Sequence, residues 1–234
     1  MFRRIRSWFF WIVAPLATIL TSIVFGVRND LGTVGNVSYL WGRTLVWSAG
    51  LKLEVKGNPP KPDRSYVYLA NHLSMLDIPV ILSALKGRVL CFGSDPQWFR
   101  RKFLGLAMRR AQHFPVDRKN LIAGYRGLLR AVGERGDGVR SVVIFPEGGR
   151  SRTGKLNDFK MGAFRAAVKH GRPVVPIFID GTWESLPPHR SLMWPRPARV
   201  VVHIGEIIET AEVDEEKLES EVRQWMMNFD TAPV

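Results

Sequence analysis

The chain has 234 residues, 46% of them hydrophobic, which fits one sizeable packed domain and excludes an intrinsically disordered chain. The single cysteine, Cys91, excludes an internal disulfide, and no CxxC or HExxH pattern indicates a structural metal. The formal net charge of +13 favours anionic partners, such as nucleic acid, an anionic bilayer surface or phosphorylated small molecules.

The first fifty residues contain two apolar segments. Residues 7–27 carry no charge, and as a helix they are long enough to cross the roughly 30 Å hydrocarbon core of a bilayer. A cleaved signal peptide is the competing interpretation. No small-residue cleavage site follows the run, so we expect an uncleaved anchor.

The topology of this anchor follows from charge. Arginines precede the first apolar segment and follow it, and both groups favour the cytoplasmic side, which one straight crossing cannot satisfy. A second, aromatic-rich segment at 34–51 can pair with the first as a helical hairpin that dips into one leaflet, with bends at Pro15 and at 28–33. We expect residues 1–50 to attach the protein to the cytoplasmic face of the inner (plasma) membrane. Spanning and dipping arrangements both stay open.

From residue 51 onward, short apolar runs alternate with helical patterns. The expected strands cover 51–55, 66–70, 88–92, 113–117, 141–145, 174–179 and 199–205. The expected helices cover 77–86, 96–111, 119–135, 158–170 and an acidic terminal segment, 212–229. This alternation predicts one α/β domain at 51–234, with a mostly parallel central sheet flanked by helices and ligands beyond the carboxyl ends of its strands. The Pro-rich segment 181–197 is expected to be a loop and has no assigned purpose.

A histidine and an aspartate follow the second expected strand, in the stretch LANHLSMLDIP (69–79). His72 and Asp77 are five residues apart, so on one regular helix they would point about 140° apart. Pro79 favours a helix that begins at Asp77 or Ile78, and the turn before it can then fold His72 back against Asp77. Alternatively, Asp77 only caps the helix and His72 is a polar loop residue.

A second candidate loop, PEGGRSRTGK (146–155), follows the strand 141–145. Its two glycines allow the backbone to approach a ligand closely, and Arg150 supplies donors suited to phosphate. It is not a Walker A loop, which disfavours nucleotide hydrolysis. Glu147 lies among basic residues, where it can hold an arginine fork, and a third strand end adds Arg118. Together these strand ends predict a base beside a phosphate-binding site; a surface turn with scattered charges is the alternative.

Four sequence blocks occur in a fixed order between about residues 66 and 180. They are NHLSMLD, which matches N-H-x4-D, then FPVDR, then FPEGGRS, which is close to F-P-E-G-T-R-S, and VVPIFI. In these blocks the chain resembles the glycerophospholipid acyltransferases, most closely the 1-acylglycerol-3-phosphate (lysophosphatidate) acyltransferase branch. The resemblance implies transfer of a fatty acyl group from an acyl thioester to the free hydroxyl of 1-acylglycerol-3-phosphate, which gives phosphatidic acid in phospholipid biosynthesis.

The resemblance also implies catalytic roles. His72 would be the general base on the acceptor hydroxyl, and Asp77 would orient its imidazole and stabilise the imidazolium. Transfer would be direct, in a ternary complex, without an acyl-enzyme. We expect no metal and no cofactor. The co-substrate would be acyl-CoA or acyl carrier protein, and the sequence distinguishes neither the donor nor the acyl-chain length.

The resemblance further implies that Arg118 and Arg150 bind the acceptor phosphate, while Glu147 and Gly148 shape that loop. Gly149 stands where the family usually has threonine, so a hydroxyl is missing at this position. Another lyso-lipid acceptor, such as a lyso-aminolipid, therefore stays open as an alternative.

Two interpretations from other classes compete with an enzyme. A nucleic-acid-binding protein fits the positive charge, but it is disfavoured by the apolar N-terminus and by the lack of zinc-finger or RNP patterns. A non-catalytic phospholipid-binding protein is the other. We expect a bilayer, a lysophosphatidate-like acceptor and an acyl donor as partners, and no nucleic acid. The cation-rich segment 98–114 can rest on anionic lipid or face water.

Overall fold

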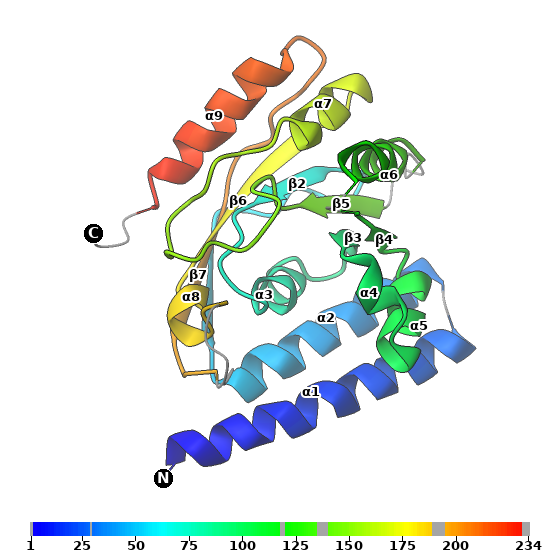
Figure 1. Cartoon of the computed structure of the whole chain (residues 1–234), viewed down its shortest axis with the longest axis vertical. Helices are drawn as coiled ribbons and strands as arrows, with labels where there is room; N and C mark the ends of the chain where they lie inside the picture. Colours follow the sequence, from blue (N-terminus) through cyan, green and yellow to red (C-terminus); the bar gives the residue numbers. More distant parts are fainter. Residues whose placement is uncertain (1, 29, 118–119, 135–139, 189–194, 231–234) are drawn as a thin grey trace.

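A seven-stranded sheet forms the centre of the structure (Figure 1). The computed structural model describes residues 2–28, 30–117, 120–134, 140–188 and 195–230. Within these ranges the strands are β1 (Lys52–Lys56), β2 (Val67–Ala70), β3 (Val89–Ser94), β4 (Phe114–Pro115), β5 (Arg140–Ile144), β6 (Val174–Asp180) and β7 (Arg199–Ile204). Their order is β1-β7-β6-β2-β5-β3-β4, and neighbouring strands are parallel except β6 with β7. The predicted, mostly parallel sheet is confirmed.

Helices cover both faces of this sheet (Figure 1). One face carries α2 (Leu31–Ala49) and α3 (Asp77–Ala84). The other face carries α6 (Leu121–Glu134), α7 (Gly162–Lys169) and α9 (Glu215–Met227). In the central strand β2, Tyr68 and Ala70 pack into the cluster on the first face, whereas Val67 and Leu69 pack into the cluster on the second. All four are buried, as expected of a strand covered on both sides.

Two segments have a different secondary structure from the one that the sequence predicted. The expected helix 96–111 is broken into α4 (Pro96–Phe99) and α5 (Lys102–Arg110). The carbonyl oxygen of Phe99 contacts α5, where it accepts a hydrogen bond from the Arg109 guanidinium (2.6 Å). The same oxygen lies so close to Gly105 that a Cβ on this residue would be only 2.2 Å away. The second difference is the short helix α8 (Thr182–Ser185) in a segment predicted to be a loop. Both features depend on contacts that local patterns do not encode.

Two N-terminal helices form a hairpin against the first face. Helix α1 (Phe2–Val27) is followed by Asp30, whose carboxylate caps α2 by accepting a hydrogen bond from the Thr33 N–H (2.9 Å). Helix α2 lies so close to α3 that a Cβ on Gly42 would stand 2.7 Å from the Pro79 carbonyl oxygen. The predicted helical hairpin is present, but α1 continues as one helix through Pro15, where a bend was expected. The division of the chain into an anchor and a domain stays a prediction.

Helix α1 forms the outermost layer and leaves an apolar face exposed (Figure 1). In the described chain, its segment Trp8–Val27 is the one stretch long and apolar enough to cross a membrane. The exposed apolar residues along it are Trp8, Phe9, Trp11, Ile12, Leu16, Leu20, Ile23, Val24 and Val27. A contiguous apolar surface of this kind is typical of contact with lipid or with another protein.

Candidate active site

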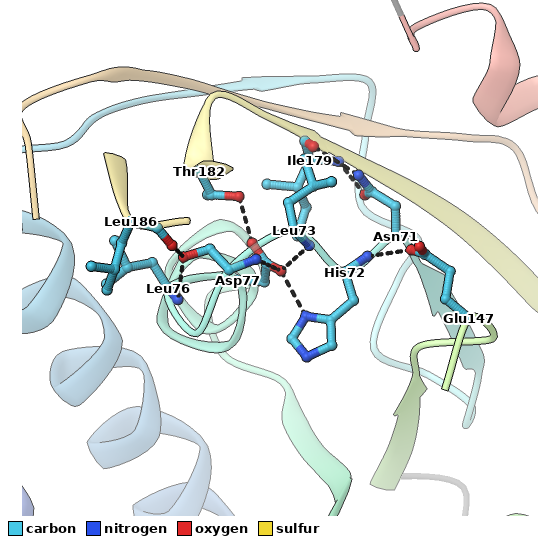
Figure 2. Close-up of polar contacts among 10 residues, drawn as sticks. Asn71, His72, Leu73, Leu76, Asp77, Glu147, Ile179, Thr182 and Leu186 are labelled. Atoms are coloured by element: carbon cyan, nitrogen blue, oxygen red, sulfur yellow. Dashed lines mark hydrogen bonds and ion pairs between the residues drawn. The ribbon is translucent and has the colours of Figure 1, made fainter. Parts of the chain in front are cut away.

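His72 and Asp77 meet in the turn between β2 and α3 (Figure 2). The imidazole Nδ1 of His72 lies 2.7 Å from Asp77 Oδ2. The same oxygen accepts hydrogen bonds from the backbone N–H groups of Leu73 (2.7 Å) and Ser74 (2.8 Å), so the turn wraps around the carboxylate. Helix α3 begins at Asp77, which removes the angular separation that one regular helix would impose. The structure thus brings together the two residues that the spacing and Pro79 had paired.

The other oxygen of the Asp77 carboxylate faces a residue that sequence analysis did not select. The hydroxyl of Thr182 donates a hydrogen bond to Asp77 Oδ1 at 2.6 Å, and both residues are fully buried (Figure 2). Thr182 lies just beyond the carboxyl end of β6. The rule that ligands collect beyond strand ends could have pointed to this segment. Nothing in its composition marks the threonine.

The imidazole of His72 is held from two sides. Its ring stacks on Phe145, with ring centroids 4.0 Å apart and an interplanar angle of 16°. Its Nδ1 faces the Asp77 carboxylate, which accepts a hydrogen bond and therefore places the ring proton on Nδ1. The lone pair is then on Nε2. A general base needs this tautomer to take a proton from a substrate hydroxyl.

Glu147 joins the loop after β5 to the backbone of His72. Its Oε1 accepts a hydrogen bond from the His72 N–H (2.6 Å), and its Oε2 accepts one from the Asn157 N–H (3.0 Å). The carbonyl of His72 in turn accepts a hydrogen bond from the Ser151 N–H (2.7 Å). Burial raises the pKa of Glu147 to about 7, against the opposing effect of the two backbone N–H groups. Because both oxygens face backbone amides, the carboxylate braces two loops instead of holding the predicted arginine fork.

The loop that carries Glu147 closes on itself. The N–H of Lys160 donates a hydrogen bond to the Pro146 carbonyl (2.8 Å), and Gly148 adopts a positive φ of 71°. The side chain of Lys160 lies across Gly148, because a Cβ built there would be 2.8 Å from its Nζ. Gly148 therefore makes room for a cation that sequence analysis missed. No local signal indicates this contact, since it depends on closure of the loop.

Arg150 and Lys160 are both exposed on this loop. Within the described residues, neither cation has a carboxylate partner among the ion pairs. A Cβ at Gly149 would meet nothing within 4 Å, so the surface beside Arg150 is open. Arg118 lies outside the described residues, and its predicted place at the site stays a prediction. Strand β4, which leads toward it, pairs with β3 at the edge of the sheet.

Cys91 and two further histidines take part in packing. Cys91 is fully buried. His113 accepts a hydrogen bond from the Phe92 N–H (3.2 Å), and the ring of His203 stacks on Phe229 at 4.0 Å. In the part of the chain that the structure describes, no three His, Cys, Asp or Glu side chains gather as they would around a metal ion. The expectation of a metal-free protein stays a prediction.

Known proteins share this sequence pattern. The model of the Acyltransferase family matches residues 52–180. The chain is 32% identical to a 1-acyl-sn-glycerol-3-phosphate acyltransferase from Cocos nucifera, over 79% of this chain and 59% of that protein. It is 27% identical to a protein of the same name from Haemophilus influenzae, over 73% of this chain and 70% of that protein. The chain thus spans about three fifths of the length of the plant relative.

The fold is also similar to a solved structure. The crystal structure of the 1-acyl-sn-glycerophosphate (LPA) acyltransferase PlsC from Thermotoga maritima matches with a TM-score of 0.84 and 25% sequence identity. The match covers 97% of this chain and 95% of that one. Both the sheet and the N-terminal helices therefore fall within the similarity.

Proposed function

Because the chain belongs to the acyltransferase family, we propose that it transfers a fatty acyl group from an acyl thioester to the free hydroxyl of 1-acylglycerol-3-phosphate. The product is phosphatidic acid, and the thiol of the donor is released. The observation that carries this proposal is the 2.7 Å contact between His72 and Asp77 at a strand end, beside the loop that exposes Arg150 and Lys160. The names of the similar proteins support the choice of acceptor.

In this reaction His72 is the general base. Its Nε2 takes the proton of the acceptor hydroxyl while the hydroxyl oxygen bonds to the thioester carbonyl carbon. The C–S bond then breaks, and the imidazolium returns the proton to the leaving thiolate. Asp77 holds the ring and stabilises its charged form. A base positioned in this way contributes about 10²–10⁴-fold in rate.

Direct transfer from donor to acceptor fits the described side chains. The one cysteine, Cys91, is buried in β3, where its thiol lies 3.7 Å from the Ala111 carbonyl oxygen. The hydroxyl of Ser74, which lies in the same turn as His72, already donates a hydrogen bond to the Leu186 carbonyl (2.8 Å). The acceptor hydroxyl itself is therefore the nucleophile that His72 activates.

Arg150 and Lys160 are the proposed ligands of the acceptor phosphate. A charge-assisted hydrogen bond of this kind contributes about 1.5–3 kcal/mol. Arg118 is a further proposed ligand on the resemblance alone. Because Gly149 supplies no hydroxyl where the family usually has threonine, another lyso-lipid acceptor, such as a lyso-aminolipid, stays the alternative.

We further propose that the protein works at the cytoplasmic face of the inner membrane. The exposed apolar face of α1 supports insertion into one leaflet, and the exposed Trp8 and Trp47 suit the interface with water. The acceptor and the product are both lipids, so they can exchange with that leaflet. Acyl-CoA or acyl carrier protein supplies the acyl group already activated as a thioester, and the proposed reaction requires no metal or cofactor.

Replacement of His72 by alanine tests the function. Phosphatidate formed from lysophosphatidate and acyl-CoA is measured by mass spectrometry, and the rate is expected to fall about 10²–10⁴-fold. The exposed His170, replaced by alanine, is the matched control and keeps the wild-type rate. A wild-type rate in the His72→Ala variant would overturn the base assignment. A parallel screen of lyso-lipid acceptors with the wild type identifies the acceptor.

A further inference from the structure

The Pro-rich segment after β6 contacts the turn that carries His72, and the proposed function does not yet use this contact. Thr182, the first residue of α8, is 105 residues from Asp77 in the sequence, yet their side chains are 2.6 Å apart and fully buried. Leu186, at the end of α8, accepts a hydrogen bond from the Ser74 hydroxyl (2.8 Å). The α8 segment therefore holds the turn at two points (Figure 2).

A glycine makes this contact possible. Gly181 has a φ of +87°, and a Cβ at this position would lie 2.1 Å from the carbonyl oxygen of Arg199 in β7. Only glycine fits both constraints, so the chain turns sharply where β6 ends. The turn starts α8 immediately and places Thr182 at the level of the Asp77 carboxylate.

The threonine hydroxyl meets an oxygen that has no other donor among the described residues. Asp77 Oδ2 receives the His72 ring and two backbone N–H groups, whereas Oδ1 receives Thr182. Without this hydroxyl, one oxygen of a buried carboxylate would lack a partner, and the carboxylate could rotate away from the imidazole. The hydrogen bond thus fixes the plane of the carboxylate.

We infer that Thr182 is a positioning residue, which orients the Asp77 carboxylate and, through it, the imidazole of His72. The inference rests on the proposed function, in which that imidazole is the general base. Thr182 acts through Asp77, so its loss affects the chemical step more than the binding of the acceptor. Thr182, an uncharged residue at the start of α8, becomes the third member of a His–Asp–Thr chain.

Substitutions that change only the hydroxyl test this role. Thr182→Val keeps the shape and removes the hydrogen bond, and kcat is expected to fall about 10- to 100-fold, with acceptor KM nearly unchanged. Thr182→Ser restores the hydroxyl and is expected to recover most of kcat. Ser185→Ala is the matched control, because it removes a buried hydrogen bond from the same helix (2.6 Å, to the Arg196 carbonyl) without touching Asp77.

A double-mutant comparison shows whether the effect passes through Asp77. In an Asp77→Asn background, Thr182→Val is expected to cause little further loss, because the residues act as a unit. The inference is overturned if Thr182→Ser is as slow as Thr182→Val, if Ser185→Ala lowers kcat equally, or if the two losses are independent.

Hydrogen exchange separates this inference from the proposed function. The N–H groups of Leu73 and Ser74 both donate to Asp77, so a loosened carboxylate exposes them. Their exchange is expected to speed up severalfold in Thr182→Val and to stay unchanged in Ser185→Ala. If the wild type acylates no lyso-lipid, the proposed function fails while this readout still decides the positioning role. Unchanged exchange at residues 73 and 74 would overturn the positioning role.

Discussion

Two carboxylates lie next to His72, and their surroundings differ at the scale of single residues. Asp77 accepts four hydrogen bonds, from the imidazole, two backbone N–H groups and Thr182, which together fix the orientation of its carboxylate. Glu147 accepts two, and its burial raises its pKa to about 7. Glu147 is therefore expected to change its charge near neutral pH, although it holds the backbone of His72 in place.

Replacement of Glu147 by glutamine tests this assignment. The pKa is raised from 4.5 to about 7 on folding, so between these values the folded protein keeps a proton that the unfolded chain releases. Stability from this group therefore falls as the pH rises from about 4.5 to 7, by up to about 3 kcal/mol, and then levels off. Glu147→Gln removes this fall, so relative to the wild type the variant gains stability across that range.

Thermal unfolding in detergent from pH 5 to 8 measures the difference between the two proteins. The exposed Glu212, replaced by glutamine, is the control and follows the wild-type curve. Parallel curves for wild type and Glu147→Gln would show that Glu147 does not titrate in this range.

Sequence analysis selected His72 and Asp77 but missed Thr182 and Lys160. His72 and Asp77 are close along the chain, and the position of Pro79 limits where the helix can begin, so local rules allowed their contact, with a simple helix cap as the open alternative. Thr182 and Lys160 reach the site only through the sheet order and the closure of a loop. Their side chains carry no distinguishing pattern, and no local rule could have selected them.

At the scale of elements, helix α9 braces the loop between β5 and α7. Asp230, just beyond this helix, accepts a hydrogen bond from the Leu156 N–H (3.1 Å). The Arg223 guanidinium pairs with Asp158 at 3.2 Å and lies 4.7 Å from the centre of the Phe159 ring. The acidic C-terminal helix thus holds the stretch that also supplies the Asn157 N–H to Glu147.

Replacement of Arg223 by alanine is expected to loosen this loop. The variant loses an ion pair to the exposed Asp158, which contributes about 0.2–1 kcal/mol, and the contact with Phe159, so the open form should become at least a few times more populated. Trypsin cleavage after Lys155, followed by mass spectrometry, measures this change. The control is Arg165→Ala, which removes another ion pair to α9 (Glu215, 3.5 Å) away from the loop. Equal cleavage of the two variants would contradict the bracing role.

The sheet was predictable at this scale, whereas two helix boundaries were not. Runs such as residues 174–179 are apolar throughout, which marks a buried strand without knowledge of its neighbours. Helix α7 was expected from residue 158 but begins at Gly162, because the Lys160 N–H is bonded to Pro146 in the closed loop. The break after Phe99 likewise depends on contacts across a tight turn.

For the whole molecule, the exposed apolar face of α1 indicates that the protein would lie on a bilayer with α1 toward the lipid. Leu16 and Leu20 are 54% and 63% exposed along this face. Ile122 on α6 and Met227 on α9 are similarly exposed, at 67% and 60%, but lie across the sheet from α1. Ile122 and Met227 can therefore serve as the control for Leu16 and Leu20, because they are similarly exposed but on the other side of the sheet.

The double variant Leu16→Asn, Leu20→Asn is expected to lose membrane attachment. Burial of one leucine in lipid stabilises by about 1.5–3 kcal/mol, so attachment should weaken more than tenfold. Flotation with anionic lipid vesicles in high salt measures it, since salt suppresses purely electrostatic binding. The control variant Ile122→Asn, Met227→Asn should float like the wild type. If the α1 variant and the control variant float equally well, α1 is not the part of the protein that binds the membrane.

The close packing at Gly42 has a mechanical consequence. Helix α2 rests directly on α3, whose first residue is Asp77, with no side chain between the helices at Gly42 to absorb a shift. If the hairpin inserts in lipid as proposed, a tilt imposed by a thinner or more curved leaflet would be transmitted to Asp77 and His72. Under the proposed function, the physical state of the leaflet would then affect turnover.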